Sequence, residues 1–327
     1  MRLYILLFDF CERLKFPSGN PLSRIKFIKA LPYFWYLFIS WVENLIVSRI
    51  GLKNAVLNKS KRDETIIASL TTYPARIETV DLTIMTIFMQ TIRPDRVVLW
   101  LAEEQFPERK LPQKLTLLQN QGLEIKFCKD YRSHKKYYLA LQEQKEAELV
   151  ITFDDDILYD PHTIERAVQK HRDNPRAVVV NQAMIPIINN DGSIAPYSIW
   201  SEANSKNNHN QLLSPLTGSG CLYPYSALTS KAFDWDAIEN GAKSTDDLWI
   251  FFQCVLARTP ILLTTPRSKT FTVVKGSQTS NLSQQNCIGD GNDRNLIILR
   301  QLFPEVERII KRQHNAEPSS FYNYPNL

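Results

Sequence analysis

Three adjacent carboxylates, Asp154, Asp155 and Asp156, are the side chains of this 327-residue chain that point most directly to chemistry. They follow the apolar run 149–153 without a break. Neighbouring carboxylates repel one another, so a fold keeps them together only where a cation or hydrogen-bond donors compensate. A divalent Mg²⁺ or Mn²⁺ shared with diphosphate oxygens would compensate. A solvated acidic loop, or a cap of the helix expected after Pro161, would explain the same residues without any chemistry.

The segments around these acids alternate between strand and helix patterns. Apolar runs predict strands at 65–70, 96–101, 123–128, 149–153 and 177–181. The segments between these runs show helical spacing or helix-start signals. This alternation indicates an α/β fold with a mostly parallel sheet flanked by helices on both faces. In such sheets ligands bind beyond the carboxyl ends of the strands. The position of the three acids therefore favours metal and diphosphate binding over a solvated loop.

Motifs in the first half of the chain resemble those of GT-A glycosyltransferases. The segment ITFDDDILYDP (151–161) looks like the metal-binding D-x-D region of that family. The segment SLTTYPAR (69–76) looks like its first strand and nucleotide-binding loop, and DYRSHKKY (130–137) like the segment that reaches the nucleotide and donor. The resemblance implies a GT-A-like, Rossmann-type sheet and sugar transfer from a nucleotide sugar.

The resemblance continues in order through the second half. The segment TGSGCLYP (217–224) is similar to a Gly-rich loop near the donor sugar, and STDDLW (244–249) to an acidic motif that opens a late helix. The segment GDGND (289–293) resembles a closing motif. The match covers about residues 64–303 and is closest to bacterial sugar transferases that build surface polysaccharides. It implies a nucleotide-sugar donor, UDP-linked by preference, and a glycan or lipid-linked acceptor.

The resemblance assigns roles on the donor side. It implies that Asp154 and Asp156 bind Mn²⁺ or Mg²⁺, which would stabilise the negative charge of the departing diphosphate. Two adjacent lysines on one helix are not expected to point inward together. The other implied donor-site residues are Thr71, Tyr73 and Arg76 for base and ribose, Asp130 for the base, Lys135 or Lys136 for the diphosphate, Asp155 beside the metal, and Gly218 and Gly220 near the sugar.

The acceptor side needs a base, because a sugar hydroxyl is a poor nucleophile. Asp246 and Asp247 open the apolar run 248–255. Acids at such a position are also common as plain caps that complement the helix dipole. The resemblance favours Asp247 as the base of an inverting enzyme, with Asp246 second; a retaining enzyme would need neither. The late segment 275–293 has no His, so water or an Asn or Asp side chain would have to complete the metal shell.

Two other classes of function fit parts of the pattern. A nucleotidyltransferase would use the same sheet and metal, but it usually has a Gly-rich phosphate loop after the first strand, and 70–76 contains no Gly. A non-catalytic, membrane-bound scaffold of this fold would be expected to lose its acids, whereas this chain keeps both acidic clusters. The metal-dependent glycosyltransferase is therefore the leading hypothesis.

The first sixty residues differ from the rest. They hold nine Lys and Arg against three acids, so a charge of +6 lies here and −1 in the remainder. Basic charge gathered at one end argues against nucleic acid as a partner. The apolar run 31–42 is shorter than the roughly 20 residues that span a bilayer. Six of the nine residues 33–41 are aromatic, with Arg24, Lys26 and Lys29 just upstream.

This composition predicts a helical, membrane-associating segment at 1–60 that lies on the anionic cytoplasmic face of the inner membrane. A pair of helices packed on the main domain, with the aromatic rings in its core, is the alternative. The catalytic domain is expected at 61–310 and a polar tail at 311–327. The odd number of Cys, five without a C-x-x-C pair, and the lack of a secretory signal indicate a cytoplasmic location.

Overall fold

The computed structural model describes residues 5–6, 26–204, 212–277 and 290–315. A seven-stranded sheet in the order β11-β6-β10-β4-β1-β2-β3 forms its centre. Neighbouring strands pair in parallel except at β10, which runs antiparallel to both β4 and β6. The strands are β1 (Thr65–Thr71), β2 (Arg96–Ala102), β3 (Leu123–Cys128), β4 (Glu148–Phe153), β6 (Val178–Val180), β10 (Ser219–Tyr223) and β11 (Ile261–Leu263).

Two smaller sheets lie beside the large one. They are β12 (Thr272–Val273) with β5 (Ile157–Leu158), and β7 (Ala183–Ile185) with β8 (Ser201–Glu202) and β9 (Ser214–Pro215). The helices are α2 (Lys26–Asn54), α3 (Val80–Phe88), α4 (Gln113–Gln119), α5 (Lys135–Gln142), α6 (Thr163–Asp173), α7 (Trp235–Gly241), α8 (Asp246–Ala257), α9 (Gly291–Leu302) and α10 (Pro304–Asn315).

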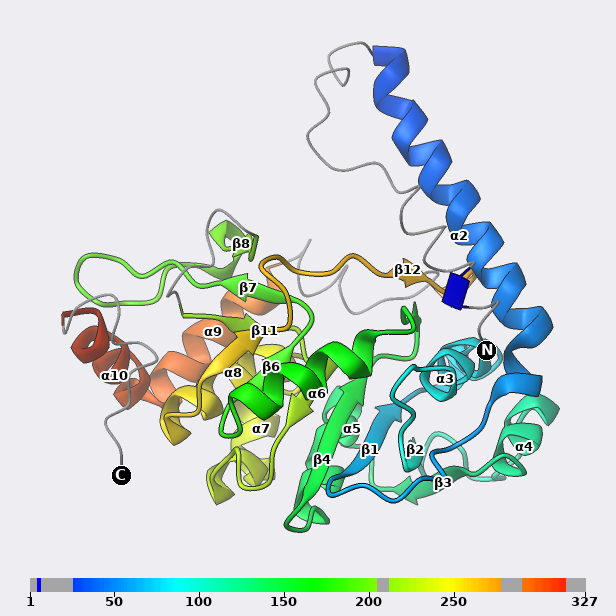
Figure 1. Ribbon diagram of the computed structural model, residues 1–327. Helices are drawn as coiled ribbons and strands as arrows, with labels where there is room; N and C mark the ends of the chain where they lie inside the picture. The colour runs from blue at the N-terminus through cyan, green and yellow to red at the C-terminus, as the bar shows by residue number, and fades with distance from the viewer. Residues whose placement is uncertain (1–4, 7–25, 205–211, 278–289, 316–327) are drawn as a thin grey trace.

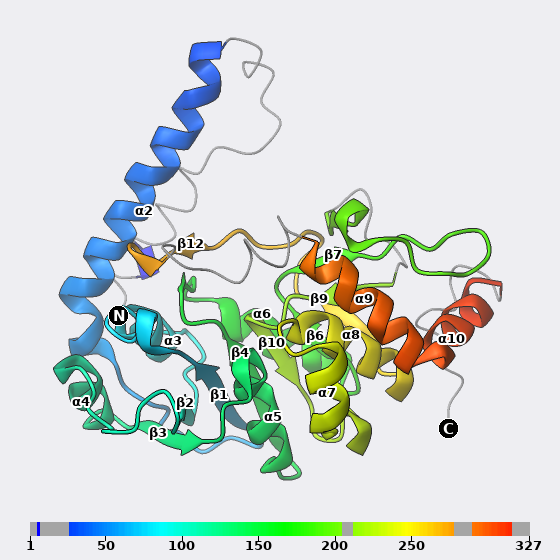
Figure 2. The same ribbon diagram turned by 180° about the vertical axis from the view of Figure 1, so that it is seen from behind.

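Helices cover both faces of the large sheet (Figures 1 and 2). One apolar cluster joins β1, β2 and β4 to α3, α4 and α6. On the other face α5 packs on β1, β2 and β4, while α8 shares a second apolar cluster with β6, β10 and β11, and α9 and α10 pack on α8. The fold is thus α/β with a mostly parallel sheet between helices, which confirms the fold class predicted from the sequence.

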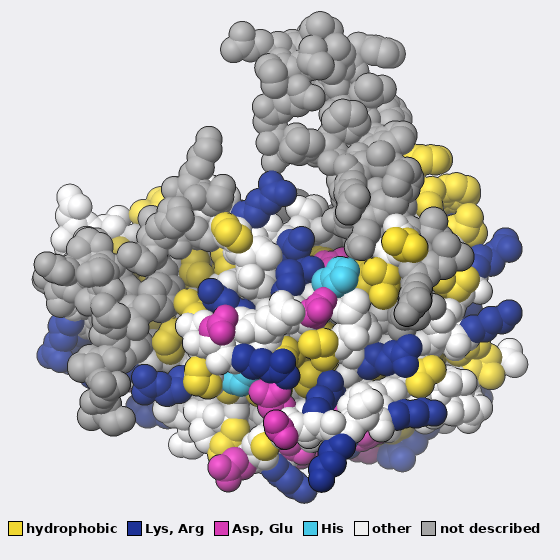
Figure 3. Space-filling view, viewed as in Figure 1, with side chains coloured by type: hydrophobic (Ala, Val, Ile, Leu, Met, Phe, Trp, Pro, Cys, Tyr) yellow, Lys and Arg dark blue, Asp and Glu magenta, His cyan; other side chains and the backbone are white. Residues whose placement is uncertain are grey.

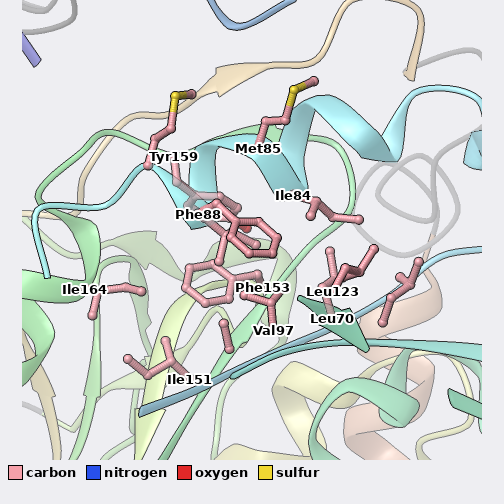
Figure 4. Packing of buried hydrophobic residues seen from close by; sticks show 14 of the residues in the cluster. Leu70, Ile84, Met85, Phe88, Val97, Leu123, Ile151, Phe153, Tyr159 and Ile164 are labelled. Atoms are coloured by element: carbon pink, nitrogen blue, oxygen red, sulfur yellow. The ribbon is translucent and has the colours of Figure 1, made fainter. Parts of the chain in front are cut away.

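The alternation of side chains along β1 explains how one strand serves both faces. Ile66, Ala68 and Leu70 belong to the cluster with α3 and α6, whereas Ile67 packs towards α5. The rings of Phe153 and Tyr159 meet edge to face at 4.7 Å in the first cluster, where Figure 4 shows them next to Phe88. This packing fixes the end of β4, and with it the acids that follow.

The parallel pairing brings several predicted site residues to one edge. The strands β1, β2, β3 and β4 run in the same direction, so the residues that follow them lie at the same edge of the sheet. Thr72 and Asp154 come directly after such strands, and Asp130 is the second residue after β3. The antiparallel β10 begins at this same edge, which places Gly218 opposite the end of β4. Ser219 therefore pairs with Phe153, 66 positions earlier in the sequence.

The helices show three features beyond the strand pattern. Between β3 and β4 lie a 3-10 turn, Arg132–His134, and α5, which ends at Gln142. In the N-terminal segment the long described helix is α2, with 29 residues, and it passes through Pro32. The last helix, α10, runs to Asn315 and so enters the segment expected to be a polar tail. Arg24 and most of residues 1–25 lie outside the described residues.

A substitution at Gly220 tests the geometry at the start of β10. Its φ is +80°, and a Cβ there would lie 2.7 Å from Thr163 Cγ2 of α6. We expect Gly220→Ala to lower the free energy of unfolding by about 2 to 3 kcal/mol, because strain and a collision add. Gly276→Ala, at φ +87° with no described atom within 4 Å, should cost only about 1 kcal/mol. Equal losses in urea denaturation would contradict the predicted collision with α6.

Candidate active site

The side chain of Lys136 links two acidic segments that lie 92 residues apart. Its Nζ is 2.6 Å from Asp154 Oδ1, at the end of β4, and 2.9 Å from Asp246 Oδ2, at the start of α8. Lys136 is only 3% exposed. Burial alone would lower its pKa, but the carboxylates of Asp154, Asp246 and Asp247 outweigh burial and raise that pKa. The ammonium group therefore stays charged and holds the two segments together.

A second cation, Arg76, neutralises the other two members of the acidic triplet. Arg76 Nη1 lies 2.6 Å from Asp155 Oδ1, and Nη2 lies 3.1 Å from Asp156 Oδ2. Thr72 Oγ1 donates to Asp155 Oδ2 at 2.5 Å. Burial raises the pKa of Asp155 despite these partners. Asp155 is thus buried and holds the segment after β1 in place through Thr72 and Arg76, while Asp154 and Asp156 keep contact with solvent.

Thr217 orients both acids at the start of α8. Its Oγ1 is 2.5 Å from Asp246 Oδ2 and 2.7 Å from Asp247 Oδ1, and its N–H donates to Asp247 Oδ1 at 2.7 Å. A threonine hydroxyl has a single hydrogen, so it can donate to only one of the two carboxylates at a time. Both carboxyl groups can form a hydrogen bond with Thr217 Oγ1 when Asp247 carries a proton: the Thr217 hydroxyl then donates to Asp246, and Asp247 donates to Thr217 Oγ1.

The two neighbouring acids titrate in opposite directions. Burial would raise the pKa of Asp246, but Lys136 and the Thr217 hydroxyl reverse this and lower it. Burial, and then the negative charge of Asp246, raise the pKa of Asp247 to about 7. One carboxylate is therefore permanently charged beside Lys136, and the other exchanges a proton near neutral pH. Such a pair of carboxyl groups with separated pKa values is typical of acid–base sites.

Gly218 packs directly against Asp154. A Cβ on Gly218 would lie 1.9 Å from Asp154 Cγ, so no side chain fits there without moving the carboxylate. The Gly218 carbonyl accepts hydrogen bonds from Asp154 N–H, at 3.1 Å, and from the Tyr159 hydroxyl. Gly220 instead contacts α6 at a bulge of β10, so its place in the fold accounts for it.

The remaining predicted donor-site residues lie further from this cluster. Lys135 is as buried as Lys136, contrary to the expectation that only one of them points inward. Its Nζ pairs with Asp130 Oδ1 at 2.7 Å, after β3. Thr71 Oγ1 donates to the Trp100 carbonyl, and the Arg76 guanidinium lies 5.5 Å from the centre of the half-buried Tyr73 ring. Lys135, Asp130 and Thr71 thus contact partners outside the acidic cluster, whereas Arg76 belongs to it through Asp155 and Asp156.

Several residues of the cluster had no predicted role. Thr217 and Thr72 hold carboxylates, and the fully buried His134 joins the Tyr137 hydroxyl at 2.8 Å to the Ala242 carbonyl at 2.9 Å. Burial lowers the pKa of His134 to about 4, so it is neutral here. The signal for Thr217 was its place directly before the Gly-rich loop.

The charges of the cluster allow a test of the predicted metal site. Among the described residues, Lys136 and Arg76 are the cations that pair with the carboxylates at positions 154–156 and 246. The side chains of Asp154 and Asp156 are 44% and 17% exposed. Within the described residues no three His, Cys, Asp or Glu side chains are placed to share one ion. A divalent cation bound by Asp154 and Asp156 would therefore need diphosphate and water oxygens as its other ligands.

Comparison with known proteins adds little. No family model matches the chain, and no curated protein does. Among solved structures, the Francisella tularensis 2-C-methyl-D-erythritol 4-phosphate cytidylyltransferase is 14% identical with a TM-score of 0.36, over 64% of this chain and 95% of that one. A 4-diphosphocytidyl-2C-methyl-D-erythritol synthase is 10% identical with a TM-score of 0.41, over 65% and 93%. Similarities of this size carry no argument about function.

Replacement of Lys136 tests the link between the two acidic segments. Lys136→Gln leaves Asp246 buried without its cation, which should lower the free energy of unfolding by about 3 kcal/mol at pH 8. In the variant, burial would raise the folded-state pKa of Asp246 above its unfolded value, so the loss should shrink as the pH falls and Asp246 is protonated. Denaturant unfolding at pH 8 and pH 5 measures both effects.

Lys135→Gln is the matched control, because Lys135 is equally buried but pairs with Asp130 instead. Its stability loss should be smaller, since Asp130 is more exposed to water. A Lys136→Gln loss that does not depend on pH would contradict the assignment of Lys136 as the counterion of Asp246.

Proposed function

We propose that this protein is a metal-dependent glycosyltransferase that moves a sugar from a nucleotide sugar, UDP-linked by preference, to a hydroxyl group of a bacterial surface glycan or lipid-linked acceptor. The observation that carries the proposal is the contact of Lys136 with both Asp154 and Asp246. It sets an acid pair suited to proton transfer directly beside carboxylates suited to a diphosphate-bound cation. The ordered motifs of the sequence support the same family.

On the donor side, Asp154 and Asp156 would hold Mn²⁺ or Mg²⁺ together with the diphosphate. A divalent cation supplies Lewis-acid stabilisation of the negative charge that a departing diphosphate accumulates. Lys136, already charged and buried, adds a fixed positive charge next to Asp154. Gly218 has no side chain, so the Asp154 carboxylate can lie directly against its backbone, and Thr72 with Arg76 fixes the backbone of the triplet through Asp155. Each of these groups is positioned before any ligand arrives.

On the acceptor side, Asp247 is the base. In an inverting displacement the acceptor oxygen attacks the anomeric carbon, its proton passes to the Asp247 carboxylate, and the diphosphate leaves with the electron pair of the broken C–O bond. Burial and the Asp246 charge raise the pKa of Asp247 to about 7, which suits a base that must take a proton near neutral pH. Thr217 N–H holds the carboxylate in one orientation.

Nucleotidyl transfer is the alternative for the same sheet. The two solved structures reported above carry the names of a cytidylyltransferase and a diphosphocytidyl synthase, so CTP belongs among the compounds to be tested. A phosphate acceptor is already ionised and needs no base. The raised pKa of Asp247 therefore favours a hydroxyl acceptor. The scaffold hypothesis has no observation in its favour, because the acids are retained and mutually positioned.

A donor screen tests the proposed function. We expect one nucleotide sugar to release its nucleoside diphosphate in the presence of Mn²⁺ or Mg²⁺, and to do so poorly with EDTA. Asp154→Asn should abolish this release, whereas Asp173→Asn, an exposed acid on α6, should leave it unchanged. Release of pyrophosphate from CTP with a phosphate acceptor, and no release from any nucleotide sugar, would replace this proposal by the nucleotidyltransferase.

The pH dependence tests Asp247 as the base. A base works when deprotonated, so the rate should fall as the pH drops below about 7. With an ordinary carboxyl as base, the rate would stay constant until the pH falls to about 4. Asp247→Asn should lower kcat by about 10²- to 10⁴-fold and remove this acid limb, with donor binding retained. An unchanged pH profile in the variant would exclude Asp247 as the base.

A further inference from the structure

The helix α2 packs on the protein through an inner side that mixes apolar and polar side chains. Ile39 and Val47 are buried, and Ile46, Ile50 and Leu52 pack against the core. The buried Glu43 and Asn44 add hydrogen bonds: Thr272 Oγ1 of β12 donates to Glu43 Oε2, and Asn44 accepts from Lys275 N–H at 3.0 Å and donates to the Val273 carbonyl at 3.3 Å. Apolar packing and hydrogen bonds together hold this side of α2 on the protein.

The outer side of α2 is an apolar stripe, defined here as Leu37, Phe38, Trp41 and Leu45. These side chains are 44%, 50%, 50% and 38% exposed. Spacings of three and four residues put them on one side of the helix, and the rings of Phe38 and Trp41 stack at 6.2 Å. Figure 3 shows hydrophobic side chains gathered on the outer flank where Figure 1 places α2. A contiguous apolar stripe of this kind marks an interaction surface.

The position and charge of the stripe indicate what covers it. Figures 1 and 2 agree that the N-terminal part of α2 extends away from the described body of the protein. Arg49 and Lys53, both exposed, follow it on the same helix. Aromatic rings beside basic side chains match the boundary between lipid headgroups and acyl chains. None of the described helices combines the length and apolarity that crossing a bilayer requires.

We propose that the apolar stripe of α2 binds the surface of an anionic lipid bilayer, with Leu37, Phe38, Trp41 and Leu45 inserted below the headgroups and Arg49 and Lys53 against their phosphates. The helix lies in the membrane surface and does not span it. This binding depends on α2 alone and is independent of the proposed sugar transfer. It would hold the Lys136 cluster near acceptors that are linked to lipid.

Vesicle flotation of the full chain tests this proposal. The protein should float with vesicles of phosphatidylcholine and phosphatidylglycerol, and much less with phosphatidylcholine alone. The triple variant Phe38→Ser, Trp41→Ser, Leu45→Ser should bind about tenfold more weakly or worse. The control Ile199→Ser, Ile297→Ser removes two equally exposed apolar side chains elsewhere and should bind like the parent. Arg49→Gln with Lys53→Gln should weaken only the binding to anionic vesicles, several-fold.

Two results would overturn the proposal. One is equal flotation of the parent and the triple variant, with both shown to be folded by circular dichroism. The other is absence of flotation together with a dimer in sedimentation that the triple variant loses, which would assign the stripe to a second copy of the chain. Nucleoside diphosphate binding, measured on the same samples, separates failure of the membrane surface from failure of the proposed activity.

Discussion

The ion pairs of one buried ammonium group determine the arrangement of the candidate site. Lys136 lies between the carboxylate that ends β4 and the carboxylate that begins α8. Without a buried cation these acids would repel one another and would have to be protonated or exposed. Their contacts with Lys136 require both α5 and α8 to begin at the carboxyl edge of the sheet. The end of β4 and the start of α8 therefore lie next to each other, although they are far apart in sequence.

The same cation divides the chemical roles of the acids. Asp246 is next to Lys136 and stays charged, and its charge in turn helps to keep a proton on Asp247 near neutral pH. Asp154, also next to Lys136, remains partly exposed and faces Gly218. A charged acid, a proton-exchanging acid and an open acid thus lie around one lysine. We infer from this that donor and acceptor meet here, at the edge where parallel sheets bind their ligands.

The sequence predicted the sheet, the edge and the acidic segments, because apolar runs and the residues that follow them are local features. It did not predict the partners of those acids. Arg76 pairs with Asp155 and Asp156 across about 80 residues, and this contact depends on the parallel pairing of β1 with β4. Lys135 and Lys136 are both buried because α5 begins at Lys135, so that one reaches Asp130 and the other Asp154. The burial of Glu43 and Asn44 on α2 also depends on a distant partner, β12.

Anomalous scattering from crystals of the full chain grown with Mn²⁺ and UDP tests the central claim most directly. The account predicts one manganese peak in contact with Asp154 and Asp156, the diphosphate beside it on the side of Lys136, and the Asp247 carboxylate facing the open space next to the β-phosphate. A nucleotide bound elsewhere would contradict the account. So would a nucleotide bound at this edge whose diphosphate lies away from Lys136 and from both acidic segments.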